Sequence, residues 1–167
     1  MLAGARRLCQ HRSMIEFRPE SEMQGRLVDS LYVEAMVLAD EARAYFDEAG
    51  RTERDGLDPL TRVTYSCESL KVTTRLMHVI AWLLTQRAVE AGELRARDAM
   101  DPSRRLGSAP ITPAIALAAL PPRARALIAA SIDLHRRIAR LDIAQENTGL
   151  GHPSPARSIQ QRLAAAF

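Results

Sequence analysis

The hydrophobic positions of this chain recur with helical spacing in three long segments, of which residues 22–49 are the first. Ser21 and Gln24 fit the S-x-x-Q capping box that starts many helices. Gly50 suits the position after the helix, because glycine accepts positive φ. The apolar stripe consists of Leu27, Leu31, Leu38, Ala42 and Tyr45, widened by Val28, Tyr32, Ala35, Ala39 and Phe46. This pattern predicts a helix over residues 22–49.

The second segment, residues 59–91, has the most regular pattern. Asp58 suits the N-cap, Pro59 suits the first turn, and Gly92 favours a stop. Its main seam alternates three and four residues apart over about four heptads, as in a coiled coil. That seam consists of Leu60, Val63, Cys67, Leu70, Thr74, Met77, Ala81, Leu84 and Ala88. A second seam on an adjacent face consists of Tyr65, Val72, Leu76, Val79 and Leu83. Two seams predict contacts with at least two other helices.

The third helical segment covers residues 122–146 and follows a break in the periodicity. Its seam consists of Ala124, Leu127, Ser131, Leu134, Ile138 and Leu141. Residues 93–111 are polar and contain two prolines and a glycine, so they predict a flexible loop. Residues 1–20 lack this periodicity and predict a disordered extension, and residues 147–167 predict a mobile tail.

Together these elements predict an all-α domain over residues 21–146, an antiparallel three-helix bundle with a long central helix. The short connection between the first two helices makes them antiparallel neighbours. The central helix exceeds the others by about 8–15 Å at the rise of an α-helix, which leaves Ala81, Leu84 and Ala88 uncovered. Either residues 111–120 fold over these positions or a second copy does. We expect a homodimer, because two-fold dimers are the commonest oligomers.

Composition agrees with this fold class. The chain is 47% hydrophobic and 26% charged, and its 4% aromatic content argues against an all-β fold. No apolar run is long enough for a membrane-spanning helix or a signal peptide. Cys9 and Cys67 lack CxxC spacing and are typical of free thiols in a reducing compartment. A cytoplasmic protein without membrane contacts is therefore expected.

The net charge of +3 is unevenly distributed, with an acidic segment over residues 19–50 and a basic segment over residues 101–167. These segments can pair within the fold, so the charge does not by itself indicate a nucleic-acid partner. Arg136, Arg137 and Arg140 form a basic side of the third helix. An alternative is therefore a DNA-binding transcriptional regulator whose duplex affinity falls steeply with salt.

Motifs for catalysis are absent from the sequence, which contains no HEXXH, CxxC, P-loop or GxGxxG pattern. We therefore predict no enzyme, no metal site and no cofactor. Glu68, Lys71, Arg75 and His78 share the most polar part of the second helix. The spacing of Glu68, Lys71 and Arg75 is typical of helix-stabilising ion pairs. A sharper interpretation is a recognition surface or a buried polar network. In a further alternative, a small all-helical enzyme would use these four side chains.

Residues 31–93 and 119–142 resemble the DUF1465 family of alphaproteobacteria, most specifically in the run ESLKVTTRLMHVIAWLL at residues 68–84. The resemblance implies a dimeric three-helix bundle without catalytic residues. It also implies a proteolytic adaptor that helps deliver cell-cycle substrates, including a CtrA-like response regulator, to the ClpXP protease. CpdR-like and PopA-like regulators are the implied further partners. By position, residues 94–111 and 147–167 correspond to segments implied in partner contacts. Our candidate interaction surface consists of Glu68, Lys71, Arg75, His78, Arg136, Arg137 and Arg140.

Overall fold

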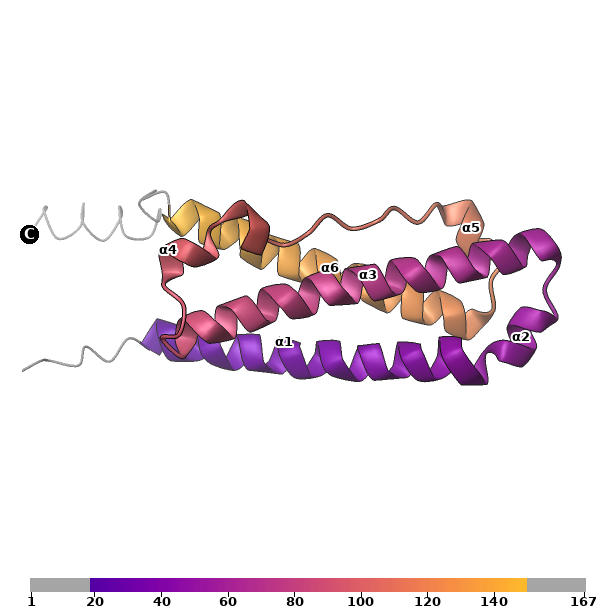
Figure 1. The fold of residues 1–167 in the computed structure, drawn as a ribbon, viewed down its shortest axis with the longest axis horizontal. Helices are drawn as coiled ribbons and strands as arrows, with labels where there is room; N and C mark the ends of the chain where they lie inside the picture. Colours follow the sequence, from indigo (N-terminus) through magenta and orange to yellow (C-terminus); the bar gives the residue numbers. More distant parts are fainter. Residues whose placement is uncertain (1–18, 150–167) are drawn as a thin grey trace, which may run out of the picture.

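The structure, a computed structural model, describes residues 19–149, which contain helices and no strands. The predicted all-α class is thus confirmed. Figure 1 shows the three long helices α1, α3 and α6 lying along one another. Their bounds are Pro19–Ala44 for α1, Pro59–Glu90 for α3 and Pro122–Gly149 for α6. The connections contain the π-helix η1 (Tyr45–Ala49), α2 (Arg51–Asp55), α4 (Ala96–Ala99), the 3-10 helix η2 (Pro102–Arg104) and α5 (Ala114–Ala118). The predicted disordered extension and mobile tail lie mostly outside the described residues.

The first helix differs from its prediction at both ends. α1 begins at Pro19, a residue that suits the first helical turn, so Ser21 lies inside the helix and not at the N-cap position. After Ala44 the chain forms η1, and Gly50 follows with a φ of −83°. The expected positive φ at Gly50 is therefore wrong. Glycine is required there for space, because a Cβ atom would lie 2.3 Å from Oη of Tyr65.

The ends of α3 follow the predicted signals. The Asp58 carboxylate accepts hydrogen bonds from the backbone N–H groups of Leu60 and Thr61, both at 3.1 Å. Gly92 has a φ of +73° and follows the last helical turn. It is the position at which the left-handed conformation of glycine is required.

The hydrophobic core lies between α1, α3 and α6. On α3 it uses the second predicted seam, with Trp82 added, rather than the longer first seam. On α6 the predicted seam is buried except for Leu141, which is half-buried. The core residues of α1 are Val28, Leu31, Ala35 and Ala42, continued by Tyr45 of η1. The more regular seam of α3 therefore points away from the other two long helices.

The directions of the helices correct the predicted antiparallel arrangement. In the contacts between α3 and α6, the residue numbers of both partners increase together, from Arg75 with Ser131 to Trp82 with Asp142. These two helices therefore run parallel. α1 runs opposite to both, as Figure 1 shows. A parallel α6 requires the chain to return along the molecule before α6 begins.

Residues 105–113, here called the strap, make this return as an extended segment beside α3 and α6 (Figure 1). At about 3.3 Å per extended residue, nine residues span about 30 Å. The segment predicted as a flexible loop, residues 93–111, thus contains α4, η2 and most of the strap. The strap does not cover Ala81 and Leu84, because its contacts lie on another side of α3.

The lengths of the long helices also revise the predicted overhang. α3 has 32 residues, α6 has 28, and α1 has 26 and continues directly into η1. The exposure of Ala81 and Leu84 therefore does not come from a projecting helix end. It comes from their position on the face of α3 opposite the core.

Candidate interaction surfaces

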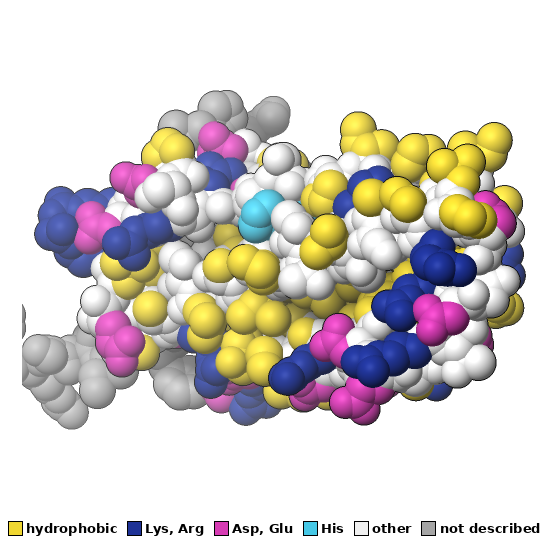
Figure 2. All heavy atoms as spheres, turned by 45° about the vertical axis from the view of Figure 1, so that its right-hand side comes forward, with side chains coloured by type: hydrophobic (Ala, Val, Ile, Leu, Met, Phe, Trp, Pro, Cys, Tyr) yellow, Lys and Arg dark blue, Asp and Glu magenta, His cyan; other side chains and the backbone are white. Residues whose placement is uncertain are grey.

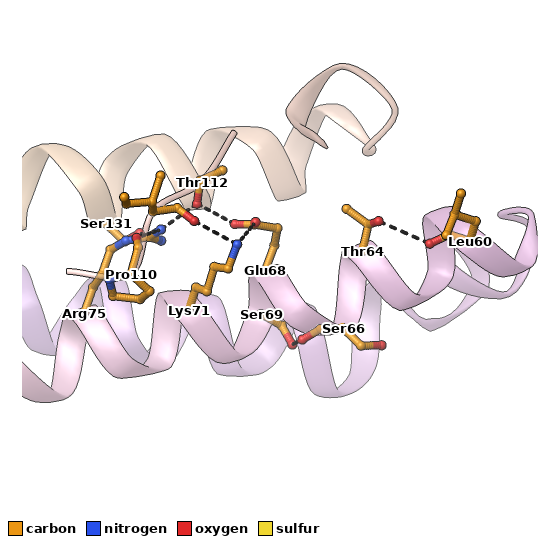
Figure 3. A network of polar contacts seen from close by, with 11 residues as sticks. Leu60, Thr64, Ser66, Glu68, Ser69, Lys71, Arg75, Pro110, Thr112 and Ser131 are labelled. Carbon is orange, nitrogen blue, oxygen red and sulfur yellow. Dashed lines mark hydrogen bonds and ion pairs between the residues drawn. The ribbon is translucent and has the colours of Figure 1, made fainter. Parts of the chain in front are cut away.

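Three of the predicted site residues form a polar network on α3, shown in Figure 3. Glu68 and Arg75 are buried, at 1% and 0% exposure. The Nζ atom of Lys71 lies 2.7 Å from Oε1 of Glu68, one helical turn away. The expected ion pair along the helix is therefore present, and its carboxylate is out of solvent. In this conformation Glu68 and Arg75 present no side-chain surface to a partner.

The network holds the strap. Nη2 of Arg75 donates to the carbonyl of Pro110 at 2.8 Å and to Oγ1 of Thr112 at 2.5 Å. Thr112 in turn donates to Oε2 of Glu68 at 2.6 Å, and Lys71 donates to the carbonyl of Ile111 at 2.9 Å (Figure 3). Burial lowers the pKa of the Arg75 guanidinium, and nearby Glu68 partly opposes this shift. These contacts fix the path of the strap through its backbone and one hydroxyl.

Two histidines, on α3 and α6, flank Gly107 in the strap. Nε2 of His135 lies 2.8 Å from the Gly107 carbonyl, which can only accept, so this nitrogen carries the proton. The predicted site residue His78 packs against the Cα of the same glycine, where a Cβ on Gly107 would lie 2.6 Å from its Nδ1. Glycine is therefore required at 107 for close packing against the imidazole ring.

The beginning of the strap is anchored at the far end of α6. Nε of Arg105 donates to Oδ1 of Asp142 at 2.7 Å, and its Nη2 donates to Glu146 at 3.0 Å. Hydrogen bonds to these two carboxylates raise the pKa of the Arg105 guanidinium. The same Asp142 oxygen accepts from the indole nitrogen of Trp82.

The three arginines predicted on α6 have different environments. Arg137 reaches across to α1 and forms a two-pronged ion pair with Glu34, at 2.6 and 2.8 Å. Arg136 and Arg140 are exposed. The acidic first helix and the basic last helix are thus joined by a direct contact. The structure brings Glu68, Lys71 and Arg75 together and does not join them to Arg137.

The longer seam of α3 is an exposed apolar face. Leu70 is 67% exposed and Met77 63% exposed, and Val63 and Leu84 are also exposed. Figure 2 shows hydrophobic side chains gathered across the middle of one side of the molecule, with charged side chains toward both ends. A groove beside this face, between α1 and α3, includes Ala39, Phe46, Leu70, Met77 and Ile80. Contiguous apolar surface of this kind is typical of an interface.

The described part of the chain holds no cluster of three or more His, Cys, Asp or Glu side chains placed to bind a metal ion. No helix within residues 19–149 is both long and apolar enough to span a bilayer.

Sequence reasoning missed the contacts of the strap. Arg105, Thr112, His135 and Asp142 take part in them, and Ser131 accepts a hydrogen bond from Arg75, which holds the strap. None of these five residues was predicted as a site residue. The partners in each contact lie 28 to 56 positions apart, so helical periodicity carries no signal for them. The available signal was the polar residue Ser131 within the apolar seam of α6, since polar groups in a core need partners.

Comparisons with known proteins agree on a single family. A family model described as "Protein of unknown function (DUF1465)" matches residues 20–167. The crystal structure of RcdA from Caulobacter crescentus CB15 is similar to this chain, at 34% sequence identity and a TM-score of 0.59. That match covers 71% of this chain and 90% of the RcdA chain. None of the curated proteins matches.

Proposed function

This chain belongs to the DUF1465 family, and on that premise we propose that it is a non-enzymatic adaptor of regulated proteolysis. It would help deliver cell-cycle substrates, such as a CtrA-like response regulator, to the ClpXP protease in the cytoplasm. CpdR-like and PopA-like regulators would be its further partners. These partners come from the family resemblance. The likeness to RcdA supports placing the chain in the same class of protein.

The exposed apolar face of α3 is the observation that carries this proposal. Val63, Leu70, Met77 and Leu84 recur every seven residues on it, and all are exposed. A heptad seam is completed when another helix packs on it. The same helix in a second copy fits such a seam around a two-fold axis. The proposed working unit is therefore a homodimer of three-helix bundles joined through α3.

Polar groups on this side of α3 are already satisfied within the helix. The hydroxyl of Ser69 donates to the carbonyl of Ser66 at 2.8 Å, as Figure 3 shows. Thr73 and Thr74 donate to carbonyls of the preceding turn at 3.1 and 3.0 Å. Burying these hydroxyls against a second copy therefore leaves no donor unpaired, which supports the use of this face as an interface.

A dimer also suits the mechanism of an adaptor. Two copies present every partner-binding surface twice, so one assembly can hold a substrate and a protease together. Linked binding of this kind strengthens capture by about 10²–10⁴-fold without new chemistry. A rigid helical scaffold keeps the geometry that such simultaneous binding requires.

Affinity capture tests the proposed partners. The full chain carrying a purification tag is expressed in cells in which a CtrA-like regulator is degraded. The proposal predicts that ClpX or the response regulator is recovered with it. A matched chain with Leu70→Glu controls for the contribution of the α3 face. Recovery of neither partner from such cells would remove the main support for the adaptor function.

A further inference from the structure

A pocket opens between the strap and α6, apart from the apolar face of α3. Strap residues 109–112 form one wall, and Ile132 and Ala139 of α6 form the other. Its volume is about 380 Å³. Concave sites with aliphatic walls and a few convergent polar groups are typical of ligand binding. The size suits a small molecule or one residue of a peptide.

Positive charge exceeds negative charge beside this pocket. Within the described residues, Glu68 is the only carboxylate hydrogen-bonded into the network, and Lys71 already pairs with it. Arg75 lines the pocket and donates only to neutral acceptors, including Oγ of Ser131 at 3.3 Å. Its Nε atom is buried without a partner in the described part of the chain. A buried guanidinium without a direct carboxylate is costly, because its charge is removed from water and, here, only partly compensated by Glu68.

A second guanidinium lies where the pocket meets solvent. Arg136 lines the pocket and is exposed, and it forms no ion pair within residues 19–149. Its neighbour Arg137 is bound by Glu34. His135 also lines the pocket and donates to the strap. No lining residue is acidic. The polar groups of the pocket therefore favour an anion.

We propose that this pocket binds a carboxylate attached to a small aliphatic group. The Arg136 guanidinium donates to the carboxylate in the two-pronged geometry that arginine favours, and the charge of Arg75 lies behind it. The aliphatic group packs against Ile132, Ala139 and the strap. A short-chain acid and the carboxyl end of an apolar peptide both have this chemistry. The inference is independent of the adaptor function.

Amide NMR titration of the full chain tests the site with sodium isovalerate, which joins a carboxylate to a branched aliphatic group. Isovaleramide has nearly the same shape without the charge, and sodium chloride matches the ionic strength. We expect saturable shifts at strap residues 108–112 and around Arg136 with isovalerate alone. Half-saturation is expected at about millimolar concentration, as for a contact of one small anion.

Two matched variants locate the anion. Arg136→Gln should weaken isovalerate binding by about tenfold, because it removes a charge-assisted hydrogen bond. Arg140→Gln changes another exposed arginine of α6 that lies outside the pocket, and should leave binding unchanged. Equal binding of isovaleramide, or unchanged binding in Arg136→Gln, would overturn the proposal.

A short N-acetylated peptide ending in valine separates the two sources of the carboxylate. Tighter binding of this peptide than of isovalerate supports the site as a receptor for a chain end. Tighter binding of isovalerate supports a free acid as the ligand. If neither titrant gives saturable shifts at the strap, the pocket is not a carboxylate site.

Discussion

Trp82 of α3 donates its indole N–H to Asp142 of α6 at 2.8 Å, and both side chains are buried. The same carboxylate binds Arg105 at the beginning of the strap. One buried acid therefore joins the two parallel helices to the segment that connects them. This contact lies at the opposite end of the strap from the Glu68 and Arg75 network.

Replacing this acid should destabilise the fold. Asp142→Asn keeps an acceptor for Trp82 but leaves the Arg105 guanidinium without its main partner. We expect a loss of about 2 kcal/mol in the free energy of unfolding, since the ion pair is largely buried. Urea unfolding at fixed protein concentration measures this loss, with Trp82 as the single tryptophan reporter. Glu146→Gln is the control, because its more exposed pair with Arg105 is worth less than about 1 kcal/mol. Equal losses in both variants would contradict the central role of Asp142.

Removing Arg75 should release the strap as well as destabilise the fold. Arg75→Met leaves the Pro110 carbonyl without its donor and removes a positive charge near Glu68. We expect a loss of about 3 kcal/mol and faster tryptic cleavage after Arg104 and Arg105, measured by mass spectrometry. Arg75→Lys should recover little of the stability lost in Arg75→Met, because an ammonium group cannot reproduce the forked contacts of a guanidinium.

An exposed arginine on α4 provides the control for this experiment. Arg97→Gln should change neither the stability nor the rate of cleavage in the strap, because Arg97 touches none of the network. Unchanged cleavage in Arg75→Met would mean that the network does not hold the strap.

Gly50 should tolerate no side chain while Tyr65 keeps its hydroxyl. A Cβ at Gly50 would lie 2.3 Å from Oη of Tyr65, so Gly50→Ala should cost about 1–3 kcal/mol through overpacking. Tyr65→Phe removes the oxygen and should recover part of this loss in the double variant. A double-mutant cycle by urea unfolding measures the coupling, and strictly additive effects would contradict the steric explanation.

The proposed dimer should depend on the exposed seam of α3. Leu70→Glu places a charge in the middle of that seam and should give a monomer, because an unpaired charge buried in the interface is strongly unfavourable. Ile143→Glu changes an exposed hydrophobic residue of α6, 56% exposed, and should leave the dimer intact. Size-exclusion chromatography with light scattering measures the mass. A monomeric parent chain, or a dimeric Leu70→Glu variant, would contradict the proposed interface.

The sequence predicted the helices more accurately than their arrangement. Asp58 and Gly92 mark the ends of α3 through local hydrogen bonds and backbone geometry, which depend on neighbouring residues. Periodicity also located the two seams of α3, but it could not tell which one faces the core. Both seams are apolar, and the choice depends on where α1 and α6 pack.

For a related reason, local sequence patterns could not predict the direction of α6 or the role of the strap. The polar composition of residues 93–111 is typical of a loop, and nothing in it specifies that three of its backbone carbonyls meet His135, Arg75 and Lys71. Those contacts exist only after the chain has returned along the molecule. The grouping of Glu68, Lys71 and Arg75 was visible in the sequence because helical spacing alone brings them together.

Reconstituted proteolysis tests the adaptor function most directly. A purified CtrA-like response regulator is mixed at limiting concentration with ClpXP and the CpdR-like and PopA-like regulators, and its disappearance is followed with and without this chain. The adaptor function predicts degradation that is faster by tenfold or more when the chain is present, within the range that linked binding provides. The same rate of degradation with and without the chain would contradict it.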